Sequence, residues 1–192
     1  MPREEDRPLI EQLATGEPGA IRWFVEAHRA AVFAFALRLS GNATLAEDIL
    51  QETFLAALRG ISGYRGEGSL KAWVLTIARR EALAQVRRNQ DTPTEEESLE
   101  FLGATAGWGA PSPEESLGDQ QRQVLVEAAL ARLAPTDREV LLLRDIEGLS
   151  GEETAAALGV PLAAMKSRLH RARLRLVAAL HPDTTEDDHG GS

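Results

Sequence analysis

The chain has 192 residues, of which 43% are hydrophobic and 27% are charged, and its formal net charge is −9. This length and composition allow one or two ordinary globular domains, and two small domains fit the sequence better than one. The absence of cysteine excludes a disulfide framework and thiolate-based zinc or redox chemistry, and it makes a reducing cytoplasm the expected location.

The negative charge is concentrated in two stretches of the chain. Residues 89–119 contain eight acidic residues and no lysine or arginine, and residues 181–192 contain four more acids. Without these two stretches the remaining chain carries a net charge of +3. The basic residues gather within 65–88 and 160–175, so the local fields there favour a polyanionic partner in spite of the total charge.

The start of the chain predicts neither export nor membrane insertion. Residues 1–7 are charged and lack an apolar signal core, and no run approaches about 18 apolar residues. Beyond this start, an apolar stripe with a three-to-four spacing runs from Ile21 to Leu39 and predicts a long helix that ends near Ser40-Gly41-Asn42. His28 lies on this apolar face, which favours a core position over a ligand role.

A second helix is predicted from Thr44 to about Arg59. Thr44 and Glu47 have the spacing of a capping box, in which the two side chains satisfy each other's backbone amides. The inward face is apolar. The opposite stripe, which is either a solvated surface or a binding surface, consists of Asp48, Gln51, Glu52, Leu55 and Arg59.

A glycine-rich loop, residues 60–69, precedes a predicted helix over 70–88. Leu70, Trp73, Val74 and Ile77 anchor this helix to a core. Another face carries Thr76, Arg79, Arg80, Leu83 and Arg87, beside a loop that bears Tyr64. A row of guanidinium groups next to an aromatic ring suits single-stranded nucleic acid, because bases stack on rings while cations follow the backbone. The loop has no preceding strand and no Gly-Lys-Ser/Thr ending, which excludes a nucleotide-binding P-loop.

Residues 91–119 are predicted to be a flexible acidic linker. Proline, glycine, serine and glutamate crowd this stretch, and its three prolines prevent a long helix. Trp108 within it is either a docking residue or an exposed aromatic without a role. The acidic end of the chain, residues 181–192, is predicted to be a disordered tail.

After the linker, two helices lead into a helix-turn-helix. Amphipathic helices are predicted over 124–133 and 137–147, the second opened by a capping box between Thr136 and Glu139. Ser150 and Glu153 then form a further capping box, Gly159 can adopt positive φ at the end of that helix, and Pro161 suits the first turn of the next.

The last helix of this unit is strongly basic. Residues 160–175 contain five basic residues and no acidic one, as expected of a helix that lies in a groove lined by phosphates. A solvated helix face is the alternative. The predicted fold is all-α, with two small helical domains over 8–90 and 120–180 joined by the linker, the second a four-helix helix-turn-helix domain.

Three segments together resemble a bacterial RNA polymerase sigma factor of the extracytoplasmic-function (ECF) group, in its compact form with only conserved regions 2 and 4. Residues 46–54 are similar to the core-polymerase-binding helix of that family. Residues 70–88 are similar to its promoter-melting and minus-10-reading segment, and residues 149–173 to its minus-35 helix-turn-helix. Three motifs in this order and spacing are far more specific than a helix-turn-helix alone.

The resemblance implies three binding surfaces. The residues for the clamp helices of core polymerase are Asp48, Gln51 and Glu52. The residues for the minus-10 strand, with the loop as the wall of a pocket for an extruded base, are Tyr64, Arg65, Gly66, Glu67, Ser69, Lys71, Trp73, Thr76, Arg79, Arg80 and Arg87. The residues for the minus-35 duplex are Ala163, Ala164, Lys166, Ser167, Arg168, His170, Arg171 and Arg173, of which Arg168 and Arg173 suit phosphates or the domain's own acids.

The resemblance also implies the partners and the absence of catalysis. Core RNA polymerase, through its clamp helices and flap, promoter DNA and an anti-sigma factor are the expected partners, and the acidic linker is expected to thread the polymerase channels or to act as a spacer. No cofactor, metal site or enzymatic reaction is expected. The chain departs from the family pattern at Arg80, Ala84 and Ala164, which leaves the promoter sequence undetermined.

Two other functions remain open at this point. One is a helix-turn-helix regulator that binds an operator without polymerase, and the other is a partner-binding adaptor. The N-terminal domain separates them from a sigma factor, because a repressor does not need a core-binding helix joined to an arginine-lined helix.

Overall fold

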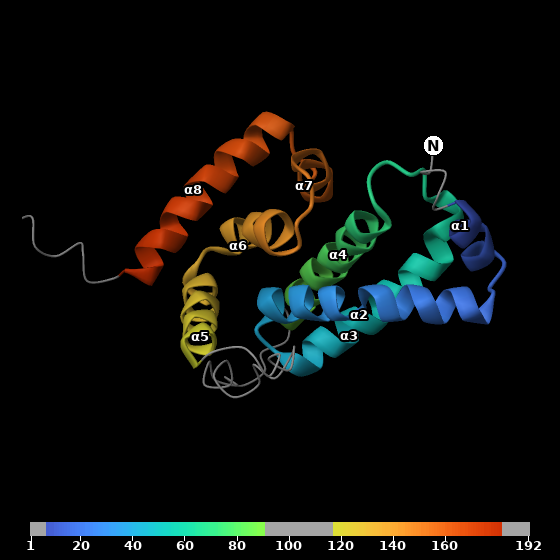
Figure 1. The fold of residues 1–192 in the computed structure, drawn as a ribbon, viewed down its shortest axis with the longest axis horizontal. Coiled ribbons are helices and arrows are strands. Elements are labelled where there is room, and N and C mark those ends of the chain that lie inside the picture. The colour runs from blue at the N-terminus through green and yellow to red at the C-terminus, as the bar shows by residue number, and fades with distance from the viewer. Residues whose placement is uncertain (1–6, 91–116, 182–192) are drawn as a thin grey trace, which may run out of the picture.

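The described residues, 7–90 and 117–181 of a computed structural model, are helical and contain no strand (Figure 1). The helices form an N-terminal domain (7–90) and a C-terminal domain (117–181), as the all-α prediction required. The N-terminal helices are α1 (Arg7–Ala14), α2 (Pro18–Ser40), α3 (Ala43–Gly60) and α4 (Leu70–Gln90), with a 3₁₀ turn, η1 (Ile61–Gly63), after α3. The C-terminal helices are α5 (Leu117–Arg132), α6 (Pro135–Leu141), α7 (Gly151–Leu158) and α8 (Leu162–Leu180), with a π-helical segment, η3 (Leu142–Ile146), after α6.

The N-terminal domain is built around the packing of α2, α3 and α4 on one another. Phe24 of α2 and Phe54 of α3 meet edge to face with ring centroids 5.7 Å apart, a favourable arrangement for two quadrupolar rings. Val74 is fully buried in the same core, and Ile49 is fully buried in a smaller cluster with Phe33, Ala36, Ala46 and Ala82. Helix α1, which the sequence analysis did not predict, adds Ile10 and Leu13 to the same core.

The predicted end of α2 is confirmed, and the predicted start of α3 is wrong. Helix α2 ends at Gly41, whose φ of 69° lets its amide donate back to Leu37. Helix α3 begins earlier than predicted, because Asn42 is its N-cap and accepts a hydrogen bond from the Leu45 amide at 2.9 Å. Thr44 therefore lies inside the first turn, and the predicted capping box of Thr44 with Glu47 is wrong.

The C-terminal domain contains four α-helices and the predicted helix-turn-helix, formed by α7 and α8. Ser150 accepts a hydrogen bond from the Glu153 amide at 3.1 Å, and the Glu153 carboxylate accepts one from the Ser150 amide at 2.8 Å. This confirms the capping box. Gly159 ends α7 with a φ of 68°, and Pro161 is the N-cap of α8. Leu149, Ala155, Leu158, Met165 and Leu169 are buried between these two helices and the rest of the domain.

The other two C-terminal helices differ from the prediction. Helix α5 begins at Leu117, ahead of the predicted start at Val124. Helix α6 begins at Pro135 with Ala134 as its N-cap and no side-chain cap, so the predicted capping box of Thr136 and Glu139 is wrong. The helix also changes pitch after Leu141, where the Glu147 amide donates to the Leu142 carbonyl, five residues back, at 2.8 Å.

The two domains pack against each other through α4 and α7, which lie side by side in Figure 1. Helix α2 also contacts α6 at the end where Arg138 donates a hydrogen bond to the Arg38 carbonyl at 3.1 Å. The sequence indicates two domains but carries no sign that they touch. The predicted linker with Trp108 and the predicted tail lie outside the described residues, apart from the ends of those segments. None of the helices in 7–90 and 117–181 is long and apolar enough to cross a membrane.

Candidate nucleic-acid and polymerase interfaces

Helix α8 presents an exposed polar face. The helix follows a tight turn and packs closely on α7, which fixes its position. A Cβ added at Gly151 of α7 would lie only 3.3 Å from the Met165 side chain of α8. Met165 and Leu169 fill the inner side of α8. The predicted minus-35 residues that are exposed on the outer side are Ala163, Ala164, Lys166, Ser167, His170, Arg171 and Arg173. This side of the helix is therefore open to a partner along its N-terminal half.

The arginines of α8 differ in their partners. Arg173 donates two hydrogen bonds to Asp145, at 2.9 and 2.6 Å, and this pairing raises the pKa of the guanidinium above its usual value. Arg171 donates to the Ser167 hydroxyl at 2.9 Å on the outer face. Of the two roles expected for Arg173, phosphate contact or pairing with the domain's own acids, the structure shows the second, and Arg168 is half-buried. Lys166 and Arg171 are exposed as well.

Helix α4 divides its predicted minus-10 residues between solvent and the C-terminal domain. Arg80 and Arg87 are exposed, and Thr76 donates its hydroxyl proton to the Ala72 carbonyl of its own helix at 2.8 Å. Arg79 instead donates two hydrogen bonds to Glu139 of α6, each at 3.1 Å. Lys71 donates to the Glu147 carbonyl at 2.8 Å and pairs with its carboxylate at 3.0 Å. The predicted row of cations is therefore partly engaged within the molecule.

The loop before α4 is tied down by Tyr64. Tyr64 is only 6% exposed, and its ring lies against that of Trp73 with centroids 5.4 Å apart, while its hydroxyl donates to the Gly68 carbonyl at 2.7 Å. Gly66 and Gly68 adopt positive φ and let the chain turn around the ring. The aromatic side chain therefore shapes this loop from inside, and its ring is not exposed for the base stacking that the sequence suggested. Arg65 and Glu67 of the loop are exposed.

The acidic stripe of α3 faces outward along its whole length. Asp48, Gln51 and Glu52 are exposed, and Leu55 in the same stripe keeps 46% of its surface accessible. The opposite side of α3 is held by Ile49 and Phe54 in the core. An exposed leucine among carboxylates is a suitable surface for a partner that offers both cations and an apolar contact.

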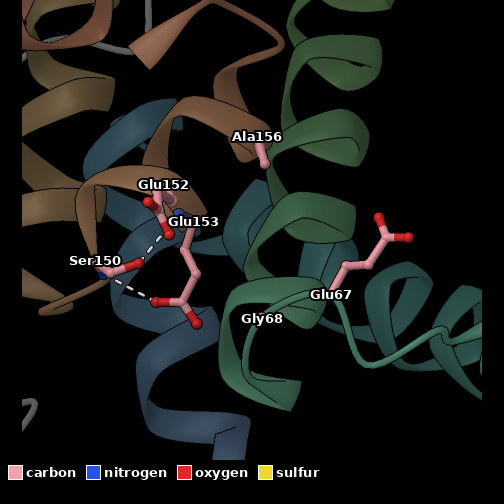
Figure 2. Close-up of a pocket in the computed structure, with 6 residues that line it drawn as sticks. All are labelled: Glu67, Gly68, Ser150, Glu152, Glu153 and Ala156. Carbon is pink, nitrogen blue, oxygen red and sulfur yellow. Dashed lines mark hydrogen bonds between the residues drawn. The ribbon is translucent and has the colours of Figure 1, made fainter. Parts of the chain in front are cut away.

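A cleft of about 460 Å³ lies where the two domains meet, shown in Figure 2. Its lining residues are Glu67, Gly68, Ser150, Glu152, Glu153 and Ala156. In the figure the Glu153 side chain extends towards the loop that carries Gly68, and Glu67 points away from it. The Glu153 Oε1 accepts a hydrogen bond from the Ser69 amide at 2.7 Å, so one carboxylate caps α7 and also holds the N-terminal domain.

The pKa of Glu153 reflects these contacts. Burial by itself would raise the pKa, but hydrogen bonds from the Ser150 and Ser69 backbone amides, supported by those two side chains, lower it to about 2. The carboxylate is therefore ionised at all ordinary pH values. Within the described residues, no three His, Asp or Glu side chains group as a metal site, and Glu153 of the cleft accepts hydrogen bonds from backbone amides of the chain itself.

The interdomain contacts are what the sequence analysis missed. Four acidic residues of the C-terminal domain meet donors of the N-terminal domain, in the contacts Arg38–Glu127, Ser69–Glu153, Lys71–Glu147 and Arg79–Glu139. Arg38 donates to Glu127 from both Nε and Nη2, at 2.9 and 2.6 Å. These partners are separated by 60 to 89 residues, and local patterns along the chain carry no signal for such pairs.

His28 has the position that its apolar helix face indicated. Its ring meets Phe24 edge to face with centroids 5.2 Å apart, and its Nε2 is buried without a hydrogen-bond partner. Burial, with a smaller effect from the Lys71 charge, lowers the pKa of the imidazole below its ordinary value. The side chain is thus a neutral packing residue at neutral pH.

Two family models match the chain and follow the two domains described above. The model for Sigma-70 region 2 matches residues 24–92, and the model for Sigma-70, region 4 matches residues 116–176. The first match contains α3, the glycine-rich loop and α4, and the second contains the helix-turn-helix.

Named relatives agree with these matches. The chain is 36% identical to the ECF RNA polymerase sigma factor EcfG of Rhodopseudomonas palustris over 80% of this chain and 81% of that protein. It is 37% identical to the ECF RNA polymerase sigma factor SigE of Mycolicibacterium smegmatis over 85% of this chain, and it spans 63% of the length of SigE. The solved structure of CnrH in complex with the cytosolic domain of CnrY aligns with a TM-score of 0.66 at 26% identity, over 93% of this chain and 99% of that one. With both conserved regions matched in order, the chain belongs to the extracytoplasmic-function group of RNA polymerase sigma factors.

Proposed function

We propose that this protein binds core RNA polymerase, directs it to specific promoters and starts transcription by reading the minus-35 duplex and capturing the minus-10 strand. The observation that carries the proposal is the exposed outer face of α8, placed by a capped helix-turn-helix in a chain that also has a region 2 domain. The protein acts by binding, in the cytoplasm, and performs no reaction of its own.

The minus-35 duplex is assigned to the outer face of α8. Lys166, Ser167, His170 and Arg171 are exposed near the start of the helix, where a recognition helix meets base edges in the major groove. Ala163 and Ala164 lie on the same exposed part and can make apolar contact with thymine methyl groups. Arg168 is assigned to the phosphates that set the register of the helix, and Arg173 to its pairing with Asp145, the other of its two expected roles.

The minus-10 strand is assigned to α4 and the loop before it. Arg80 and Arg87 are exposed and suited to the strand's phosphates, and Arg65, Gly66, Glu67 and Ser69 border the place for an extruded base. Lys71 and Arg79 belong to the same surface when the C-terminal domain is not paired with them. Thr76 lies between these two residues on α4 and faces the strand. The Tyr64 and Trp73 rings, which contact each other, support the loop from its core side.

Core polymerase is assigned to the exposed stripe of α3. Asp48, Gln51 and Glu52 would pair with the clamp helices of the large polymerase subunit, and Leu55 would add apolar contact beside them. The flap of the polymerase is assigned to the C-terminal domain. An anti-sigma factor is a further proposed partner. The solved structure of the relative CnrH contains the cytosolic domain of CnrY, and Leu174 and Val177 of α8 offer exposed apolar surface for such a partner.

Run-off transcription tests this function directly. Start sites mapped after overexpression would supply a promoter fragment, which is then incubated with sigma-free core polymerase and the purified chain. We expect a transcript that depends on the chain. A gel shift of the same fragment without polymerase, together with no transcript, would instead select an operator-binding regulator.

The α3 assignment has its own test with a charge-matched control. The double variant Asp48→Ala with Glu52→Ala should lose binding to core polymerase and lose the transcript. The control Glu11→Ala with Glu26→Ala removes two exposed carboxylates from α1 and α2 and should keep both. Equal polymerase binding by the two double variants would remove the α3 stripe from the interface.

A further inference from the structure

Two arginines in the second half of α8 are paired with acids of α6 and η3. Arg173 donates from Nε and Nη2 to the two carboxylate oxygens of Asp145, at 2.9 and 2.6 Å. Arg175 donates from Nη1 to Oδ2 of Asp137. Asp137 belongs to the first turn of α6, and Asp145 belongs to η3, which follows α6 without a break. One continuous element therefore supplies both acids that hold α8.

The two arginines lie on opposite flanks of α8. The buried line of the helix is marked by Met165, Leu169 and Ala172. At about 100° per residue, Arg173 lies about 80° to one side of Met165 around the helix axis, and Arg175 lies about 80° to the other side. Each arginine is thus at an edge between the buried and the exposed face. A rotation of α8 about its axis, in either direction, must strain one of the two ion pairs.

The apolar contacts along the buried line oppose separation of α8 more than they oppose its rotation. Burial of apolar surface is favourable in proportion to the area removed from water, and it has no preferred direction. The Met165 side chain adapts its shape to the space around it, and Ala172 offers only a methyl group for interlocking. An arginine that gives two parallel hydrogen bonds to one carboxylate is directional. The ion pairs are therefore the contacts best suited to fix the rotation.

The two pairs differ in their exposure to solvent, which decides how each can be tested. The side chains of Arg173 and Asp145 are 55% and 33% exposed, and exposed ion pairs contribute little to the free energy of unfolding. The Asp137 side chain is only 5% exposed, so it would carry an uncompensated charge without Arg175. Asp145 can therefore be replaced alone, whereas Asp137 and Arg175 are replaced together.

We propose that Asp137 and Asp145 are positioning residues, which set the rotation of α8 about its axis and so aim its outer face at the base edges of the minus-35 duplex. This inference rests on the proposed function of that face. The two acids act through their arginines and need no contact with DNA.

The geometry of α8 makes base reading sensitive to this rotation. Ser167 and His170 are exposed and lie roughly opposite Met165 around the axis, so a rotation moves them sideways across the groove. Their tips lie about 5–6 Å from the axis, and a rotation of about 10° displaces a tip by about 1 Å. A binding site that discriminates well holds its groups to about 0.5 Å. Loss of one ion pair should therefore lower base discrimination.

The test measures base discrimination by holoenzyme, assembled from core polymerase and the full chain. Two fragments are compared by gel shift, namely a promoter taken from mapped start sites and a copy whose minus-35 element is scrambled. The readout is the ratio of the two dissociation constants. Partial unfolding of the chain weakens binding to both fragments by the same factor, so a loss of stability alone leaves the ratio unchanged.

Three single variants address the exposed pair. Asp145→Ala removes the carboxylate, Asp145→Glu keeps one that can still reach Arg173, and Glu152→Ala removes an exposed acid of α7 as the charge-matched control. We expect Asp145→Ala to lower the ratio about tenfold, within the discrimination that one good base contact carries. Asp145→Glu should retain most of the ratio, and the control should retain all of it.

The buried pair is tested by removing both of its charges. Asp137→Asn with Arg175→Gln leaves no uncompensated charge at the buried position. We expect this double variant to lower the ratio as well, because the opposite flank of α8 is then unrestrained. Thermal melts of each variant record its folded fraction beside the ratio.

Four results would overturn the inference. An Asp145→Ala ratio equal to that of the control means that the ion pair does not aim the helix. Tighter binding to both fragments, with a salt slope steeper by about one and an unchanged ratio, means that Asp145 only withholds Arg173 from phosphates. An equal loss in Asp145→Ala and Asp145→Glu assigns the effect to something other than the ion pair. An unchanged ratio after removal of the buried pair means that one flank is enough.

The unmodified holoenzyme separates failure of this inference from failure of the proposed function. If it does not distinguish the two fragments, the proposed minus-35 reading is wrong and the inference falls with it. If it distinguishes them and the Asp145→Ala holoenzyme does so equally well, the proposed function stands and only the positioning role is rejected.

Discussion

Glu139 of α6 accepts both of its side-chain hydrogen bonds from Arg79 of α4, at 3.1 Å each, and so joins the two domains through a nearly buried carboxylate. We predict that Glu139→Ala lowers the free energy of unfolding by about 1–3 kcal/mol, because Arg79 then loses a charge-assisted partner in a partly enclosed place. Urea unfolding followed by far-UV circular dichroism measures the change.

A double-mutant cycle separates the pair from the effects of truncation. Arg79→Ala, Glu139→Ala and the double variant should give a coupling energy of about 1 kcal/mol or more in urea unfolding. Additive losses within about 0.3 kcal/mol would show that the two side chains do not stabilise each other.

The capping box of α7 provides a second prediction. Ser150→Ala removes the hydroxyl that accepts from the Glu153 amide, and we expect it to lower the free energy of unfolding by about 0.5–2 kcal/mol. Ser150→Asp should retain most of the stability because aspartate is an equally good N-cap. Thermal melts of the two variants compare them, and equal losses would show that the cap is not what matters at this position.

We expect the free energy of unfolding to fall in acid, because Glu153 then becomes protonated. Its pKa of about 2 lies below the ordinary value of 4.5, so the unfolded chain binds more protons between these two pH values. The stabilisation by the ionised carboxylate is fully present above about pH 4.5, and it is lost as the pH falls towards 2. Urea unfolding from pH 6 to the acid limit, compared with Glu153→Gln, measures the difference in slope.

The predicted difference in pH dependence comes from one titratable group, Glu153. In this window the unmodified chain should take up as much as about one more proton on unfolding than Glu153→Gln does. Identical slopes for the two proteins would mean that the Ser69 and Ser150 contacts do not hold the carboxylate in its ionised form.

The outer face of α8 gives a prediction for DNA binding in the presence of core polymerase. Lys166→Ala and Arg171→Ala should each weaken binding to a minus-35 duplex by about 1–3 kcal/mol if the side chain reads a base, or reduce the salt slope by about one if it contacts a phosphate. Arg132→Ala removes an exposed cation of α5 and serves as the control. A loss in the control as large as in Lys166→Ala would indicate a general charge effect.

Much of the local structure could be predicted from the sequence, because it depends on neighbours along the chain. The apolar spacing gave the helices α2, α3 and α4, and the Ser150–Glu153 box and Gly159 gave the helix-turn-helix. The same capping pattern gave wrong predictions at Thr44 and Thr136. In the first case Asn42 stands two residues earlier and caps the helix, and in the second Pro135 already starts the helix and Glu139 is taken by Arg79.

Less of the candidate site than of the local structure could be predicted from the sequence. The identity of the basic residues on α4 and α8 indicated nucleic acid, but nothing along the chain showed that Lys71 and Arg79 are paired with distant glutamates. Tyr64 was expected to offer a ring for base stacking beside the arginine row, whereas its contacts with Trp73 and Gly68 bury it. Each of these differences depends on tertiary contacts that local periodicity does not contain.

The π-helical segment after α6 has a geometric consequence for the two acids on either side of it. Eight residues of regular α-helix turn about 80° beyond two full revolutions, which would direct Glu139 and Glu147 to different sides. The wider turn absorbs one additional residue, or about 100° of rotation, and brings the two carboxylates back towards a common direction. If residues 142–146 adopted regular α-helical pitch without losing a residue, Glu147 would turn by about 100° away from Lys71, and the antiparallel match of these two acids with two cations of α4 would be lost.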